Sequence, residues 1–175
     1  RLATDFAVTR EALRQLAARD SILLHCLDDA TEQRMKAEVD QVLRTGDTVG
    51  GVFEVRVFGL PIGLGTCANW DERLDGRLAQ AVMSIQAVKA VELGEGMSVA
   101  AAPGSLAQDP IGYDAAAREF TRAGNHAGGL EGGITNGQEL IVRGYLKPIS
   151  TLRRPLPSVD FATRQPVKAA YERSD

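Results

Sequence analysis

The chain of 175 residues contains only two cysteines and two histidines. Its positive and negative charges almost balance, with a formal net charge of -3 at pH 7. Cys26 and Cys67 are too few for a disulfide framework or a four-ligand zinc site. His25 and His126 cannot form a metal cage built from histidines alone. The slight negative charge provides no global positive field that would attract nucleic acid.

Long apolar runs are also missing from the sequence. No stretch reaches the ~18 consecutive apolar residues of a membrane-spanning helix, and no basic segment followed by an apolar one opens the chain, so we expect no signal peptide. The chain starts at Arg1 rather than Met and stops at Asp175 without a polar tail, which suggests a piece of a longer polypeptide. Its 44% hydrophobic content suits a globular protein.

Glycine is the residue type in excess. Eighteen of the 175 residues are glycine, above a typical share of roughly 7%, and they concentrate in residues 124–144. Paired glycines in residues 128–137 could expose backbone amides to a phosphate or a flat ring. A multi-turn surface loop or tight backbone packing explains the same residues, and both interpretations stay open.

Hydrophobic periodicity predicts a chain of mixed helices and strands. Asp28 or Asp29 is a suitable N-cap for the second helix, and Gly46 is a suitable end. The pattern indicates an α+β or mixed α/β protein in one body. We expect helices at residues 9–19, 30–44, 71–84 and 114–122, and strands at 52–60, 88–93, 139–147, 158–161 and 167–171.

Residues 63–68 match the G-x-G-x-x-A pattern of dinucleotide-binding proteins. That chemistry requires a helix to open inside the motif, so that free amides face the pyrophosphate. Here Pro61 precedes the motif and the best helix start, Asp71, follows it. The sequence therefore favours a glycine-rich connection without a ligand.

The surroundings of four further side chains can be predicted from their sequence neighbours. His25 lies between apolar neighbours, which favours a packed histidine, and Cys67 has no evident base nearby, which favours a small packed side chain. Trp70 is expected to be a partly buried anchor at the start of a helix. His126 could contact a ligand or stabilise its loop by a hydrogen bond.

Polar groups gather at two places near the end of the chain. Residues 147–151 combine an amine, two hydroxyls and a proline after a strand, which suits an anion, although an ordinary polar loop is the more frequent case. Arg173 could clamp a phosphate or carboxylate, and Asp175 could accept a proton. An exposed charge pair of little energetic value is the alternative for these two.

Several motifs in order resemble one enzyme family. They are GDTVGG (46–51), EVRVFGLPIGLG (54–65), LAQAVMSIQAVKAVELGEG (78–96), NHAGGLEGGITNG (125–137), LKPIST (146–151) and YERSD (171–175). This order resembles chorismate synthase, the last enzyme of the shikimate pathway. Family chains are considerably longer, and their N-terminal histidine, arginine and arginine-serine motifs are not recognisable here.

The resemblance implies an α+β fold, a β-α-β sandwich with mainly antiparallel sheets, of which residues 1–175 would be a single-domain fragment. It implies a lyase of aromatic amino-acid biosynthesis that eliminates phosphate from 5-enolpyruvylshikimate 3-phosphate to form chorismate. Reduced FMN is the implied cofactor, reduced either by the protein itself with NADPH or by an outside reductase. The implied state is a cytoplasmic homotetramer, with neither nucleic acid nor membrane as a partner.

The resemblance also implies site residues. Asp175 would lie near the flavin N5 and help set its protonation, while His25 and His126 match no histidine motif of the family and receive no acid role. Ser150 stands where proline is frequent in the family. A non-catalytic flavin- or phosphate-binding module, or a piece serving only in assembly, is the alternative function. The residues implied to contact FMN are Gln86, Ala87, Gly132, Lys147, Pro148, Ile149, Ser150, Thr151 and Arg173.

Overall fold

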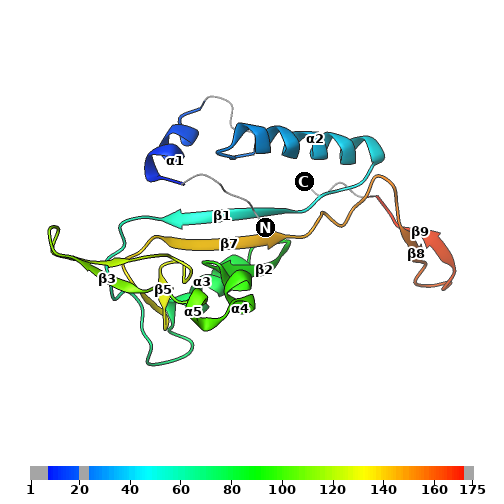
Figure 1. Cartoon of the computed structure of the whole chain (residues 1–175). Helices are drawn as coiled ribbons and strands as arrows, with labels where there is room; N and C mark the ends of the chain where they lie inside the picture. Colours follow the sequence, from blue (N-terminus) through cyan, green and yellow to red (C-terminus); the bar gives the residue numbers. More distant parts are fainter. Residues whose placement is uncertain (1–7, 20–23, 172–175) are drawn as a thin grey trace. The chain divides into compact units, whose positions relative to one another are not determined.

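The computed structural model describes residues 8–19 and 24–171, which group into two compact units (Figure 1). The central unit comprises Gly50–Pro148, and the terminal unit comprises residues 1–49 and 149–175. The expected single domain over residues 1–175 stays a prediction. Within the described residues, no helix has both the length and the apolar character needed to cross a membrane.

The terminal unit begins with two capped helices. In α1 (Arg10–Ala17), the side chain of Thr9 accepts a backbone N–H of the first turn at 3.1 Å. In α2 (Asp29–Thr45), Asp28 accepts a backbone N–H in the same way at 2.9 Å. These caps satisfy backbone donors that have no partner inside a helix. Both predicted helices are confirmed, including the N-cap.

The same unit also contains a small hairpin. Strands β8 (Pro157–Val159) and β9 (Pro166–Lys168) pair antiparallel. The carboxylate of Asp160 accepts the backbone N–H of Thr163 at 2.6 Å and closes the turn. The two predicted strands are confirmed, although each is shorter than expected. The turn begins at Asp160, and β9 ends at Lys168.

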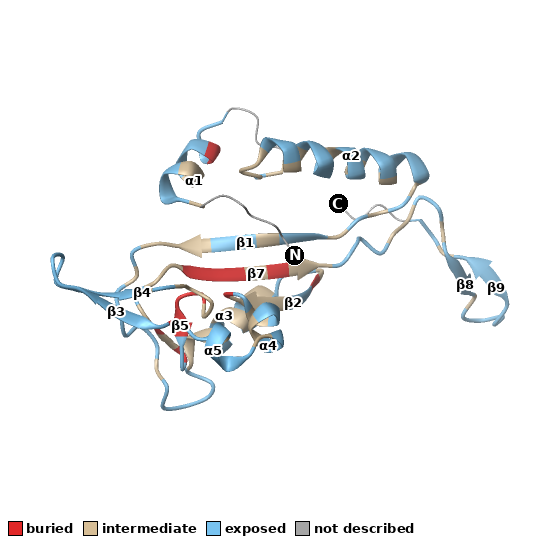
Figure 2. Ribbon diagram, in the orientation of Figure 1, coloured by how far each residue is buried: buried red, intermediate tan, exposed pale blue. Residues whose placement is uncertain are grey.

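The central unit is built on a three-stranded antiparallel sheet. Its order is β1 (Gly51–Val57), β7 (Leu140–Leu146) and β2 (Val88–Leu93), so β7 is paired on both sides. In register, Glu54 and Glu92 both lie opposite Arg143. Burial is concentrated on β7 and beside it (Figure 2). The three predicted strands are confirmed.

One face of this sheet packs against helix α3 (Leu74–Met83). The apolar side chains of α3 recur at helical spacing and meet apolar side chains that alternate along the strands. This arrangement confirms the predicted third helix and its core-facing side. The core consists of Leu130, Leu140 and Val142, with Val57, Leu60, Leu74, Leu78, Val82, Val91 and Leu93 packed against them.

The predicted helix at residues 114–122 is wrong. The segment forms a hairpin of β3 (Ile111–Asp114) and β4 (Glu119–Arg122). The carboxylate of Asp114 accepts the N–H groups of Ala116 and Ala117 at 2.8 and 3.0 Å, so this residue starts a turn and not a helix. The alanine-rich stretch is too short to be a stable helix, and the β-prone residues on each side pair instead.

The remaining elements of the central unit are short. They are α4 (Gly96–Ala101), α5 (Gly104–Ala107), β5 (Leu130–Glu131) and β6 (Ile134–Thr135). Every strand pair in the described part of the chain is antiparallel. The prediction of an α+β protein with antiparallel sheets is therefore confirmed.

Candidate functional site

Part of the expected cofactor site lies at one end of the central sheet. Val88 pairs with Leu146 at the ends of β2 and β7, so the flanking residues leave the sheet together. The backbone N–H of Lys147 donates to the carbonyl oxygen of Ala87 at 2.8 Å. Gln86 and Lys147 are exposed. The structure thus brings residues 86–87 and 147–148 into one accessible surface, as a shared site requires.

Local backbone geometry creates this surface. A tight turn follows α3, closed by the N–H of Val88 donating to the carbonyl of Ile85 at 3.2 Å, and Ala87 takes a left-handed φ of 68°. Before β1, a side chain on Gly50 would collide with the carbonyl oxygen of Leu146 and come within 3.2 Å of Pro148. Glycine at position 50 therefore allows the chain to pass close to the lysine-proline segment.

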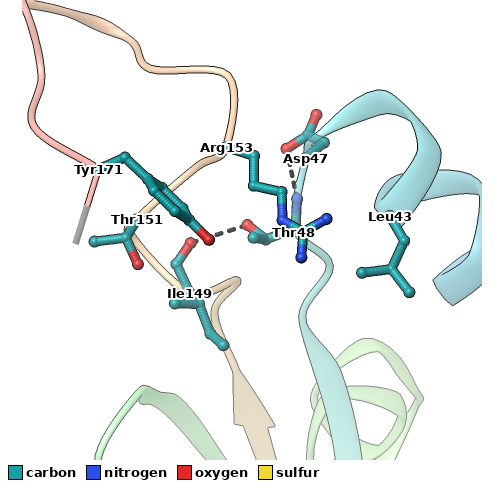
Figure 3. Close-up of a pocket in the computed structure, with 7 residues that line it drawn as sticks. All are labelled: Leu43, Asp47, Thr48, Ile149, Thr151, Arg153 and Tyr171. Carbon is teal, nitrogen blue, oxygen red and sulfur yellow. Dashed lines mark hydrogen bonds between the residues drawn. The ribbon is translucent and has the colours of Figure 1, made fainter. Parts of the chain in front are cut away.

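Ile149 and Thr151, which follow Pro148 in the LKPIST motif, line a cavity of about 190 Å³ in the terminal unit (Figure 3). Its wall combines two threonine hydroxyls, a guanidinium and a carboxylate with apolar side chains. Sites for drug-sized ligands measure roughly 300–1,000 Å³, so this cavity suits a phosphate-sized group and not a whole flavin. The lining residues are Leu43, Asp47, Thr48, Ile149, Thr151, Arg153 and Tyr171.

Gly132 lies apart from these groups. It is exposed in the turn between β5 and β6, and a side chain there would meet no atom within 4 Å. The next residue, Gly133, accepts the N–H of Leu74 at 3.1 Å, which places this turn at the start of α3. Gln86 follows the other end of α3, and a ten-residue helix is roughly 15 Å long. The structure therefore does not bring Gly132 beside Gln86.

Two of the expected site residues cannot be placed. Arg173 and Asp175 lie outside the described residues. Their expected roles in anion binding and flavin protonation stay predictions. Ser150 is exposed beside the cavity-lining residues of its loop.

The glycine motif at residues 63–68 serves packing, as the sequence favours. No helix opens within it, since α3 begins at Leu74. Instead, the N–H of Gly63 donates to the carbonyl of Thr135 at 2.9 Å, and the N–H of Leu64 donates to the hydroxyl of Thr135 at 2.8 Å. The motif is joined to the β5–β6 hairpin, and its amides at these positions are not free for a pyrophosphate.

The expectations for three other side chains are wrong, whereas His126 stabilises its loop. His25 and Cys67 are exposed, and Trp70 is 85% exposed. The backbone of His25 has a left-handed φ of 51°, a conformation that histidine adopts more readily than most residues. His126 lies 3.3 Å from Glu95, and its backbone N–H donates to the buried carboxylate of Asp109 at 2.9 Å.

The second face of the central sheet carries an ion network that the sequence analysis did not predict. Arg143 donates to Glu54 at 2.6 Å and lies 3.6 Å from Glu92, which also accepts the hydroxyl of Tyr145. Burial alone would raise the pKa of Glu92, but these donors and the N–H of Met97 lower it overall. The alternation of charged and apolar residues in the strands is the signal that could have revealed this network.

The same network also contains Glu139, a carboxyl group whose pKa is raised, whereas that of Glu92 is lowered. Arg56 donates to Glu54 at 2.6 Å and to Glu139 at 3.1 Å. Burial raises the pKa of Glu139, and the positive charge of Arg56 offsets this only partly. One oxygen of Glu139 is buried and finds no hydrogen-bond partner among the described residues. The contacts of the network join neighbouring strands, which indicates a structural role.

The cavity contains functional candidates that the sequence motifs alone did not single out. Asp47, Thr48, Arg153 and Tyr171 were not among the expected site residues. Their only sequence signal is their position in the GDTVGG and YERSD motifs or just after KPIST. Proximity between residues more than a hundred positions apart is a property of the tertiary structure.

Comparison with known proteins points to one family. A family model described as chorismate synthase matches residues 6–175. A chorismate synthase of Koribacter versatilis is 69% identical over 169 residues, which cover 94% of this chain and 43% of that protein. A chorismate synthase of Solibacter usitatus is 62% identical over 169 residues, covering 97% of this chain and 43% of its own length. The chain spans about two fifths of the length of these relatives.

A solved structure agrees with these relatives. The structure, described as a crystal structure of chorismate synthase, matches with a TM-score of 0.68 and 44% sequence identity. The match covers 74% of this chain and 38% of the solved one. The expected α+β fold is thus confirmed by a structure as well as by the pairing of the strands.

Proposed function

Because this chain belongs to the chorismate synthase family, we propose that the full-length protein carrying it converts 5-enolpyruvylshikimate 3-phosphate to chorismate and phosphate. The observation that carries the proposal is the 69% identity over 94% of the chain. The activity would belong to the last step of the shikimate pathway, in the cytoplasm.

The proposed reaction is an elimination. A C–O bond to phosphate and a C–H bond break, a new C=C bond forms, and a proton and phosphate leave, with no net change in oxidation state. Reduced FMN, when bound, would supply transient electron density that helps to expel phosphate. The chain's own residues would bind and orient two anionic molecules and exclude water.

The described residues of this chain fit such a cofactor in part. Gln86, Ala87 and the Lys147–Pro148 segment form an accessible surface that could support a flat ring. The hydroxyl of Thr151 and the guanidinium of Arg153 line a cavity suited to a phosphate-sized group, with Ile149 and Ser150 in the same loop.

We extend the proposal to the remaining expected residues. Gly132 would contribute an uncrowded stretch of backbone. Arg173 would hold an anionic group, and Asp175 would help to set the protonation of the flavin. The active state would be a homotetramer. The alternative of a non-catalytic binding module makes a different prediction about turnover.

The test is phosphate release by full-length protein supplied with reduced FMN and 5-enolpyruvylshikimate 3-phosphate. We expect phosphate and chorismate in equal amounts, and we expect Asp175→Ala to lower the rate while FMN still binds. FMN binding without any chorismate from the folded wild-type protein would favour a binding module. Folded protein that neither binds FMN nor releases phosphate would contradict the proposal.

A further inference from the structure

The turn after α2 is tied to the loop that follows β7. The hydroxyl of Thr48 donates to the carbonyl of Ile149 at 2.9 Å. The N–H of Arg154 donates to the carbonyl of Gly46 at 3.1 Å. Both bonds lie within the terminal unit and bracket the loop at its two ends. Figure 3 shows the first bond beside the cavity.

The turn itself has a defined shape. Gly46 closes α2 in the left-handed conformation at φ 73°, and the N–H of Asp47 donates to the carbonyl of Val42 at 2.9 Å. The carboxylate of Asp47 then accepts the N–H of Thr48 at 2.8 Å. These hydrogen bonds fix the backbone of Thr48 against the end of α2, and they thereby fix the position of its hydroxyl.

The loop has few other restraints. Ile149 is 57% exposed and Ser150 is also exposed. Among the described residues, the bonds from Thr48 and to Gly46 are the hydrogen bonds recorded for the backbone of residues 149–154. A loop that must be ordered on binding loses affinity because its conformational entropy opposes the complex.

We propose that Thr48 is a positioning residue that holds residues 149–151 in their cofactor-binding conformation. The inference rests on the proposed function, which assigns this loop to the FMN site. Thr48 acts through the carbonyl of Ile149 and leaves the hydroxyls of Ser150 and Thr151 available to the ligand. The helix end thereby orders the loop before the ligand arrives.

FMN titration of the full-length protein tests the proposal. Thr48→Val removes the hydroxyl at constant shape, and we expect FMN to bind roughly three- to tenfold more weakly, the range for one lost hydrogen bond. Thr48→Ser keeps the hydroxyl and should restore wild-type affinity. Thr45→Val is the matched control, because the hydroxyl of Thr45 donates to carbonyls within α2 and, in the described part of the chain, to no others.

Hydrogen exchange without ligand separates positioning from direct contact. The amide of Arg154 should exchange severalfold faster in Thr48→Val than in wild type, and Thr48→Ser should not change it. Weaker FMN binding with unchanged exchange would overturn the proposal, since Thr48 would then contact the ligand itself. Thr48→Ala is a second test should valine disturb the fold, and loss of folding in both would also overturn it.

The outcome for the wild type distinguishes this inference from the proposed function. Wild-type protein that binds no FMN contradicts the proposed function. Wild-type protein that binds FMN, with Thr48→Val binding equally well, overturns the positioning role alone.

Discussion

Single residues of this chain owe their chemistry to neighbours from distant segments. Glu92 is a clear case, because its side chain is only 10% exposed and yet its pKa is lowered. Burial opposes the charge, but the hydroxyl of Tyr145, the N–H of Met97 and the charge of Arg143 favour it more strongly. The folded state therefore holds Glu92 ionised where the unfolded chain would begin to take up a proton.

This linkage predicts a pH-dependent effect of Tyr145→Phe. A lowered pKa stabilises the fold above the ordinary glutamate value, and this stability is lost as pH falls through the folded value. Removing the hydroxyl raises the folded pKa, so the variant should lose roughly 1–3 kcal/mol at pH 7 and less at pH 3. Urea unfolding of wild type and variant at pH 7 and at pH 3 measures the two losses of stability. Tyr113→Phe, in an exposed hairpin, is the control.

Equal losses by Tyr145→Phe at the two pH values would contradict the linkage. Such a result would assign the effect to packing of the ring alone, since packing does not depend on the charge of Glu92.

For helices and strands, the residue types predicted the structure correctly where neighbouring residues alone determine it. An N-cap at Asp28 or Asp29 and the end of α2 at Gly46 were predicted from residue type, because capping involves only the adjacent turn, and the structure selects Asp28. The helix prediction for residues 114–122 was wrong. The alanines of this segment favour a helix, but Tyr113 pairs with Phe120 across the hairpin, and this pairing decides the structure. Their rings lie 5.3 Å apart in an edge-on contact.

The helix end yields a second prediction. Gly46→Ala places a side chain at φ 73°, and the left-handed conformation costs an L-residue about 1–2 kcal/mol. We expect a loss of that size in the free energy of unfolding. Gly104→Ala is the matched control, because Gly104 has no positive φ and open space around it. A loss shared equally by both variants would show that the conformation of Gly46 is not the cause.

Across the whole molecule, burial is distributed unevenly. Strand β7 is paired on both sides and holds three buried residues in succession, Leu140, Ile141 and Val142. The β8–β9 hairpin has only two strands, and all the residues of both strands are exposed. Two isolated strands are marginally stable in water, so the β8–β9 hairpin and strand β7 should open with very different free energies.

Amide hydrogen exchange of the full-length protein measures this difference. We expect Val142 to exchange orders of magnitude more slowly than Val167, because opening β7 requires disrupting the core of the central unit. Similar protection of both amides would contradict the prediction and would indicate that other parts of the assembled protein cover the hairpin.

The principal helices and strands, the α+β class and the family could be predicted from the amino-acid sequence, because caps, periodicity and ordered motifs are local features of the chain. In contrast, the contact of Ala87 with Lys147, the separate position of Gly132 and the bond from Thr48 to Ile149 became visible only in the folded chain. Each of these outcomes depends on strand pairing or on a turn joining segments far apart in sequence. Such contacts form only when the folded chain brings the segments together, and no local propensity encodes them.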